Sequence, residues 1–176
     1  MKLSLPTFVS RAMHAAAVAA ALTTAPAAHA APTACAKDEE TIFRCPATND
    51  RTVAVCASQG FTAQRGSLQY RYGPADNAEL TLPPGRDSPP RDSAVLGNVL
   101  LSGGGGSGLR FASGGYRYMV YSAVVRGAGA KAGVGVWQGT KQISNIRCRN
   151  AKAEIDVPRL EKAGFAQASE PFDLPE

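Results

Sequence analysis

Short runs of β-prone residues alternate with clusters of turn-forming residues along most of this chain, and this alternation restricts the fold more than any other feature. Thr41–Cys45 and Arg51–Cys56 flank the turn-forming sequence Pro-Ala-Thr-Asn-Asp, and Ser67–Tyr72 and Ala78–Leu82 flank Gly-Pro-Ala-Asp-Asn. Proline, glycine, asparagine and aspartate favour turns at such positions. Each pair of runs therefore predicts a β-hairpin.

The segment Tyr116–Val125 has the strongest strand pattern, with aromatic or β-branched residues at most of its positions. Alternation along a strand puts Tyr118 on one face and Arg117 on the other, and Ser113–Gly115 supplies the preceding turn. With the hairpins, these runs predict about nine strands, which is typical of an antiparallel sandwich or small barrel. The remaining expected strands are Val95–Leu101, Leu109–Phe111, Gly133–Trp137 and Gln142–Cys148.

Ser102–Gly108 contains only serine and glycine. A glycine run binds phosphate where it joins a strand to a helix, but the residues that follow predict another strand. We therefore expect a flexible exposed loop, which either connects strands or binds a partner, with the basic loop Arg126–Lys131 as its neighbour.

Pro83–Ser93 has four prolines and predicts a surface loop without helix. Glycines alternating with valines in Gly133–Trp137 predict a tight bend or a close backbone approach.

Residues 1–30 have the pattern of a secretory signal peptide, with a basic start, the apolar stretch Ala12–Leu22 and an Ala-His-Ala end, so we expect cleavage after Ala30. A membrane anchor is the alternative, but the apolar stretch is about half of the roughly twenty residues needed to cross a bilayer. A lipid anchor on Cys35 would lack the usual preceding leucine. We expect a periplasmic or secreted protein with no membrane span.

The expected organisation is a signal peptide at 1–30, a β domain at 31–148 and a C-terminal tail at 149–176. The tail mixes acidic and basic residues. Pro158–Ala163 predicts one short helix in it, because proline is favoured at the start of a helix and Gly164 at its end.

The predicted mature chain keeps four cysteines, and an even number in an exported protein predicts two disulfides, with three possible pairings. A metal site made of the four thiols is the alternative. No Cys-x-x-Cys pair is present, however, so we expect neither a metal nor another cofactor. The cysteines are Cys35, Cys45, Cys56 and Cys148.

The expected net charge of the mature chain is modest. Removing Lys2 and Arg11 from the 19 basic residues, against 14 acidic residues, leaves +3. The basic clusters and interleaved aromatics of a nucleic-acid-binding protein are missing, so we expect no nucleic-acid partner.

No histidine is expected in the mature chain, because His14 and His29 both lie in the signal peptide. This excludes Ser-His and Cys-His nucleophile pairs, a histidine base and a histidine metal ligand. Two carboxylates could still act as a glycosidase pair. The acidic cluster Asp38–Glu40 is more typical of a solvated segment, however, and Asp76 and Glu79 flank a turn. We interpret the protein as a non-enzyme.

An aromatic-x-Cys segment at Phe43–Cys45, a Ser-Gly segment at Ser107–Phe111, an aromatic strand at Tyr116–Tyr118 and a late cysteine, Cys148, follow one another in the sequence. This arrangement resembles the bacterial periplasmic and membrane-bound inhibitors of C-type lysozyme, which are small β-barrels. Phe111 replaces the tyrosine of the family's Ser-Gly-x-x-Tyr loop. The mature sequence is also similar to a group of uncharacterised secreted proteobacterial proteins.

The resemblance implies a disulfide pairing. Inhibitors of this family bridge the late cysteine to the first one, which implies a bond between Cys45 and Cys148. That bond would leave Cys35 to pair with Cys56.

The resemblance also implies a partner-binding site, in which Ser107 enters the lysozyme cleft. The family's lysine would fall near Tyr121, so a cation would have to come from Arg117, Arg126 or Lys131. The residues expected to bind a partner are Ser107, Gly108, Arg117, Tyr121, Arg126 and Lys131.

The leading hypothesis is a periplasmic binding protein that inhibits or neutralises a cell-wall-degrading enzyme. The enzyme would be a lysozyme or, for an immunity-like protein, a toxin hydrolase. The alternatives are a structural envelope protein, whose tyrosines only pack across strands, and a carbohydrate-binding module.

Overall fold

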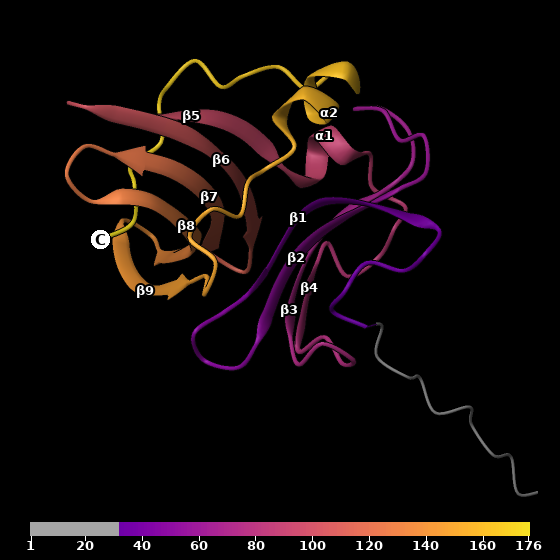
Figure 1. The fold of residues 1–176 in the computed structure, drawn as a ribbon. Coiled ribbons are helices and arrows are strands. Elements are labelled where there is room, and N and C mark those ends of the chain that lie inside the picture. The colour runs from indigo at the N-terminus through magenta and orange to yellow at the C-terminus, as the bar shows by residue number, and fades with distance from the viewer. Residues whose placement is uncertain (1–31) are drawn as a thin grey trace, which may run out of the picture.

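The computed structural model describes residues 32–176, so the predicted signal peptide lies outside the described residues. Two antiparallel sheets make up this part of the chain (Figure 1), each a simple meander in which every strand pairs with the next one in sequence. The four-stranded sheet contains β1 (Glu39–Pro46), β2 (Thr52–Ser58), β3 (Leu68–Gly73) and β4 (Leu80–Leu82). The five-stranded sheet contains β5 (Val95–Leu101), β6 (Gly104–Ser113), β7 (Tyr116–Val125), β8 (Gly129–Gln138) and β9 (Lys141–Arg147).

The predicted mainly β fold is confirmed, with two antiparallel sheets, two disulfides and a short C-terminal helix. Within residues 32–176 neither sheet closes into a barrel. The hairpins form where turn residues predicted them. Between β6 and β7, for example, Gly114 and Gly115 have φ values of 57° and 81°, which suit the tight turn that matches the twist of the strands.

The main core lies between the two sheets. Alternate side chains of each sheet face it, among them Val55 and Tyr70 from the four-stranded sheet and Leu109 and Val120 from the five-stranded sheet. The Tyr70 ring lies 5.8 Å from that of Phe111, centroid to centroid, so aromatic contact joins the sheets directly. We call the face of the five-stranded sheet that meets this core its inner face, and the opposite face its outer face.

Both disulfides predicted from the resemblance are present. Cys35 pairs with Cys56, and Cys45 pairs with Cys148. Because Cys45 lies on β1 and Cys148 follows β9, the second bond joins one sheet to the other.

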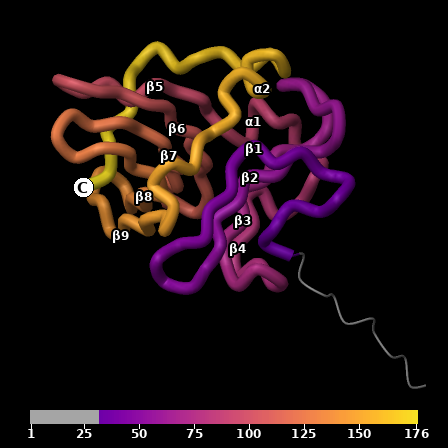
Figure 2. The backbone as a smooth tube through the Cα atoms, viewed as in Figure 1, coloured from indigo at the N-terminus to yellow at the C-terminus, as the bar shows by residue number. Residues whose placement is uncertain are grey.

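The C-terminal residues 149–176, which we expected to form a tail, are packed on the β domain. Their helix α2 (Val157–Lys162) begins with a side-chain cap from Asp156 and buries Leu160 in the main core. Beyond it the chain crosses the five-stranded sheet and ends beside β9 (Figure 2), where the Asn145 side chain donates a hydrogen bond of 2.7 Å to the Glu176 carbonyl. On the way Phe172 is buried on the outer face.

The glycine run is a strand, which contradicts the expected flexible loop Ser102–Gly108. Only Ser102 and Gly103 form a turn, and Gly104–Gly108 pairs with β5 on one side and β7 on the other. The backbone hydrogen bonds that the two neighbouring strands supply offset the conformational entropy that glycine loses in a strand. A Cβ on Gly106 would lie 2.1 Å from the Ser122 carbonyl oxygen, so the strands approach too closely there for any side chain.

Two further expectations need correction. Pro83–Ser93 ends in one helical turn, α1 (Pro90–Ser93), because Pro90 occupies a first-turn position where no N–H donor is needed. Lys131 lies within β8 and not in a loop. The close approach predicted for Gly133–Trp137 is confirmed: Val134 faces the core, and a Cβ on Gly135 would meet the Trp137 ring at 2.4 Å.

No helix in the described part of the chain has the length and apolar character needed to cross a membrane.

Candidate functional site

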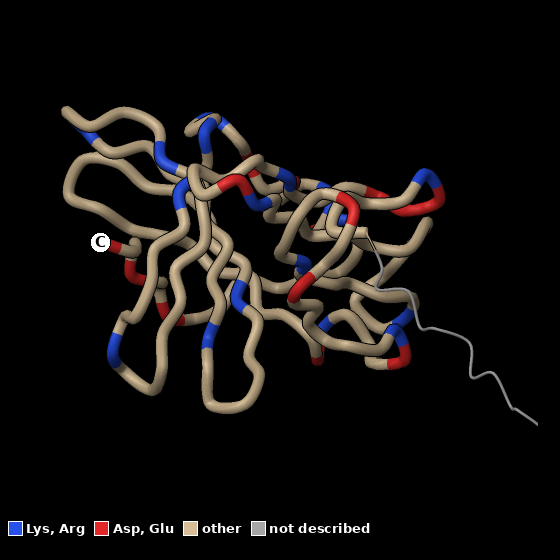
Figure 3. The backbone as a smooth tube through the Cα atoms, turned by 90° about the horizontal axis from the view of Figure 1, so that it is seen from below, with Lys and Arg blue, Asp and Glu red and all other residues tan. Residues whose placement is uncertain are grey.

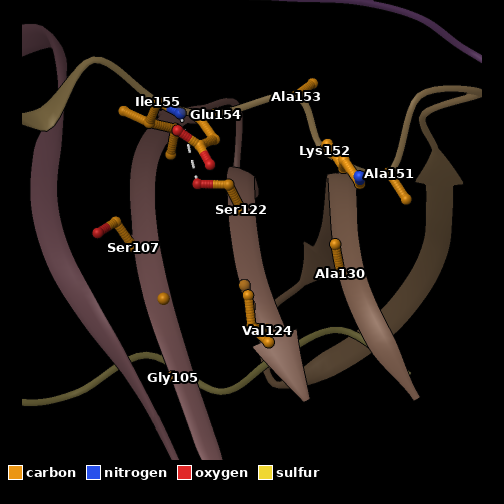
Figure 4. Close-up of a pocket in the computed structure, with 12 residues that line it drawn as sticks. Gly105, Ser107, Ser122, Val124, Ala130, Ala151, Lys152, Ala153, Glu154 and Ile155 are labelled. Carbon is orange, nitrogen blue, oxygen red and sulfur yellow. Dashed lines mark hydrogen bonds between the residues drawn. The ribbon is translucent and has the colours of Figure 1, made fainter. Parts of the chain in front are cut away.

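A hollow of about 470 Å³ lies on the inner face of the five-stranded sheet. Its floor is formed by residues with small or no side chains on β6, β7 and β8, and the segment 151–155 closes one side of it (Figure 4). We call this hollow the trough. Residues of the sheet that line it are Gly105, Gly106, Ser107, Ser122, Ala123, Val124 and Ala130.

Strand register places three successive cross-strand rows of the inner face between the main core and the hairpin tips. The first of these rows is wholly apolar, the second carries three polar side chains, and the third is apolar again, with a glycine in it. In the same order the rows are Leu96–Leu109–Val120–Val134, Asn98–Ser107–Ser122–Ala132 and Leu100–Gly105–Val124–Ala130.

The third row places large apolar side chains in solvent. Leu100 is 69% exposed and Val124 is 61% exposed, and they flank Gly105 across the three adjacent strands. Exposed aliphatic side chains that border a hollow are typical of interaction sites. The arrangement can therefore accept an apolar group between Leu100 and Val124.

The segment 151–155, which forms one side of the trough, is hydrogen-bonded to the floor. The Ile155 backbone N–H donates a hydrogen bond of 3.4 Å to the Ser122 hydroxyl, and the Ile155 side chain is buried in the main core. Lys152 and Glu154 line the same side as exposed charged residues. The Ser107 hydroxyl points away from Ser122 in Figure 4 and is free to meet a ligand from another direction.

The six expected partner-binding residues do not form one surface. Ser107 lines the trough on the inner face. Gly108, next to it on β6, is buried on the outer face, where a Cβ would meet the Phe172 ring at 2.7 Å. Arg117 and Lys131 also occupy outer-face positions, paired with Ala112 and Ala123. Consecutive residues of a strand point to opposite faces, so a site expected on a loop is divided between two faces.

Tyr121 is buried and is not available for direct partner contact, contrary to its expected role. It packs with Met119 and Phe172 on the outer face, and its hydroxyl makes a 2.9 Å hydrogen bond to the Asn145 side chain. Burial raises the pKa of Tyr121 above its ordinary value of 10.0, although the Asn145 hydrogen bond and the charge of Arg147 act in the opposite direction. The side chain is therefore a neutral packing residue.

Arg126 is exposed at the turn between β7 and β8. Its backbone N–H donates a hydrogen bond of 2.8 Å to the Gly103 carbonyl, so the tips of the β5–β6 and β7–β8 hairpins lie side by side. The expected proximity of the two segments is confirmed at this point. It places one cation beside the open end of the trough.

Two members of the acidic cluster Asp38–Glu40 are ion-paired and not simply solvated. The Glu39 carboxylate is buried and accepts hydrogen bonds of 2.9 and 2.6 Å from Arg71. Burial alone raises the pKa of Glu39, but hydrogen bonds from Arg71 and the Ala36 N–H outweigh it and hold the pKa below its ordinary value of 4.5. Hydrogen bonds from Arg159 likewise lower the pKa of Glu40. These carboxylates stabilise the fold.

One group of metal-binding residue types, Cys35, Glu39 and Cys56, comes together in the described residues. The two cysteine sulfurs form a disulfide, and the Glu39 carboxylate binds Arg71. Their ligand atoms are therefore already engaged.

Sequence reasoning missed a charge asymmetry that the sequence does contain. Residues 93–153 include no aspartate or glutamate, so the five-stranded sheet carries cations only. Figure 3 shows basic positions on its hairpins, and the acidic positions nearest to them belong to the C-terminal segment that ends at the label C. The cations of the sheet and its hairpins are Arg110, Arg117, Arg126, Lys131, Lys141 and Arg147.

Comparisons with known proteins add no relative to this picture. The similarity to lysozyme inhibitors therefore rests on the residues quoted for it. No family model, no curated protein and no solved structure matched the chain.

Proposed function

We propose that this protein is an exported, non-catalytic binding protein that holds an apolar segment of a protein partner in the trough, next to an acidic cleft of that partner. The observation that carries the proposal is the pair Leu100 and Val124, both more than half exposed, beside a hollow in a sheet that has no acidic residue. An exposed apolar pair supplies the contact area. Arg126 at the neighbouring turn and Lys152 on the side of the trough supply the positive charge that would attract an acidic cleft.

The trough can accept an inserted group because its floor carries no large side chains. Gly105, Ala130 and the two serines leave space above the sheet, and a hollow of about 470 Å³ falls in the size range of small binding sites. Its floor consists of strands paired on both sides, so little conformational entropy is lost there when a partner binds.

The family resemblance implies that this protein inserts into the partner, but we propose that the partner inserts into this protein. Ser107 lies within a hollow, so it receives a group from the partner and does not enter the partner's cleft. The proposed partner class remains a cell-wall-degrading hydrolase, either a lysozyme or a toxin. Catalytic carboxylates of such an enzyme would approach Lys152 and the neighbouring Arg126, and Glu154 is the one acidic residue among those described that lines the trough.

Biolayer interferometry with purified C-type lysozyme tests this proposal. Val124→Glu places a charge in the apolar row, and Ser107→Tyr fills the trough, so each should weaken binding about tenfold or more. Ile143→Glu is the matched control, because Ile143 is 47% exposed on β9 and does not line the trough. It should bind like the unmodified protein.

Charge steering provides a second readout. Arg126→Glu should slow association most at low salt, where the Debye length is greatest, and leave thermal stability unchanged. Two results would count against the proposal. One is no binding of lysozyme. The other is equal loss of binding in Ile143→Glu and Val124→Glu. Binding of isolated peptidoglycan with no binding of lysozyme would favour a carbohydrate-binding module instead.

A further inference from the structure

The second feature of interest lies on the outer face of the five-stranded sheet, away from the trough. Arg110 on β6 and Arg117 on β7 occupy diagonal positions on adjacent strands, because Arg110 pairs with Met119 and Arg117 pairs with Ala112. Both arginines line two adjoining hollows, of about 230 and about 400 Å³. We call the two hollows with their shared arginines the arginine site.

These two arginines differ from every other arginine in residues 32–176. Six of the others form ion pairs with carboxylates, and the remaining four are exposed. Arg110 and Arg117 are half-buried, yet neither forms an ion pair with any described carboxylate. Asp92 and Asp173 line the edges of the hollows but lie beyond ion-pair distance.

Aromatic rings and a backbone carbonyl hold the two guanidinium groups in place. The Arg110 guanidinium carbon lies 4.4 Å from the centroid of the Phe172 ring, and that of Arg117 lies 5.9 Å from the centroid of Trp137. Arg117 also donates a 2.8 Å hydrogen bond to the Gly139 carbonyl. These contacts position the cations without neutralising them.

Glycines on the strands make room for these rings. A Cβ on Gly97 would lie 2.6 Å from the Phe172 ring, and a Cβ on Gly135 would lie 2.4 Å from the Trp137 ring. The aromatic rings therefore lie directly on the sheet backbone and form a rigid floor beside the guanidinium groups.

The arginine site holds two positive charges and no paired carboxylate among the described residues. Burial lowers the pKa of Arg110 below its ordinary value of 12.5, and the neighbouring charge of Arg117 lowers it further. Two cations that share a partly desolvated hollow repel each other. An anion that bound between them would remove this repulsion and accept hydrogen bonds from both guanidinium groups.

We propose that the arginine site binds a small organic anion, whose carboxylate or phosphate group lies between Arg110 and Arg117 and whose apolar part packs against the partly exposed Trp137. The site is on the opposite face of the sheet from the trough, so it does not depend on the proposed function. Planar guanidinium groups suit both oxyanions, because each can accept two parallel hydrogen bonds.

Trp137 makes the proposal directly measurable, because it is the only tryptophan in the chain. Its fluorescence is followed while benzoate, inorganic phosphate or benzamide is added at constant ionic strength, and calorimetry checks each affinity. Benzoate carries a carboxylate on an aromatic ring, and benzamide is its neutral analogue. A saturable change with benzoate, phosphate or both, and none with benzamide, supports the site and identifies which oxyanion it prefers.

Variants then locate the binding. Arg110→Gln and Arg117→Gln should each weaken the preferred anion about tenfold or more, which corresponds to about 1.4 kcal/mol. Arg65→Gln is the matched control, since Arg65 is exposed and forms no ion pair with any described carboxylate, and it should leave anion binding unchanged. If a glutamine variant does not fold, the lysine variants keep the charge but lose the planar fork and should still weaken binding.

Three results would overturn the proposal. The first is no saturable fluorescence change with either anion. The second is equal binding of benzamide and benzoate, because then the charge contributes nothing. The third is unchanged affinity in a folded Arg110→Gln, Arg117→Gln double variant.

Discussion

The two sheets treat charge in opposite ways. Glu39 and Glu40 on β1, and Glu79 just before β4, are each paired with an arginine, and the Glu39–Arg71 pair is almost completely buried. The five-stranded sheet has no carboxylate on any strand. Its two half-buried arginines rest on aromatic rings instead. The comparison teaches that the carboxylates of the four-stranded sheet are paired within the protein, whereas the cations of the five-stranded sheet have no carboxylate partner among the described residues.

The sheets also differ in how they use small residues. The four-stranded sheet packs side chains on both faces, because the N-terminal segment and its disulfide to Cys56 cover the face opposite the core. The five-stranded sheet has glycines on β5, β6 and β8, and these leave either a hollow or a seat for an aromatic ring. The buried ion pair thus lies in the four-stranded sheet, and both proposed binding sites lie on the five-stranded sheet.

The strongest test of this division is removal of the disulfide that joins the sheets. Cys45 and Cys148 are 103 residues apart, so replacing both by serine should lower the free energy of unfolding by about 4 to 5 kcal/mol in the chain-entropy model. The Cys35–Cys56 bond closes a separation of only 21 residues, and its removal should cost about 3 kcal/mol. Urea denaturation measures both, and a larger effect of the short bond would reverse the expected order.

The next largest effect should come from the buried ion pair of the four-stranded sheet. Glu39→Gln leaves Arg71 buried without a carboxylate, which should cost about 3 kcal/mol. Glu79→Gln makes the same chemical change in the exposed pair with Arg51 and should cost much less, because water screens that pair. Thermal unfolding of both variants gives the comparison. Equal costs would mean that the buried pair is not special.

In the five-stranded sheet the corresponding test uses consecutive glycines of β6. A Cβ on Gly106 would lie 2.1 Å from the Ser122 carbonyl oxygen, so Gly106→Ala forces two paired strands apart and should cost about 1 to 3 kcal/mol. On Gly105 the nearest atom would be the Val99 carbonyl oxygen at 3.1 Å, so Gly105→Ala should cost much less. If Gly105→Ala proves the more damaging in chemical denaturation, the strand assignment of the glycine run is wrong.

The smallest predicted effect is a pH dependence that belongs to the four-stranded sheet. The pKa values of Glu39 and Glu40 are lowered on folding, so the unfolded chain binds more protons below pH 4.5. Their contribution to stability is complete above that pH and is lost as the pH falls through the lowered folded values. Melting temperatures measured at decreasing pH should drop less steeply in Glu39→Gln. Arg110→Gln should keep the original slope, since no carboxylate pairs with Arg110.

Much of the strand layout was predictable because it depends on local chemistry. Turn residues mark both early hairpins, and alternation in Tyr116–Val125 assigned its side chains to the correct faces. The helix at Val157–Lys162 follows from a proline near its start and a glycine after its end. The disulfide pairing was different, since the cysteine count allowed three pairings and the family resemblance indicated one.

The candidate sites could not be predicted from local sequence in the same way. Leu100 and Val124 are 24 residues apart in sequence and flank one glycine only because β5, β6 and β7 are in register. The acidic cluster was interpreted as solvated because the neighbouring sequence does not show which residue pairs with a carboxylate. The partner of Glu39 is Arg71, which lies on another strand. Tyr121 was assigned to a partner although the structure buries it.

The sequence by itself determined where most hairpin turns lie, how many cysteines could pair and that residues 93–153 carry only cations, because turn propensity, cysteine count and charge are properties of single residues and short segments. Only the tertiary structure decided that the glycine run is a central strand and that Arg110 and Arg117 share one hollow. Both outcomes arise from pairing between distant segments. A glycine's conformation and an arginine's partner depend on what lies beside them in space.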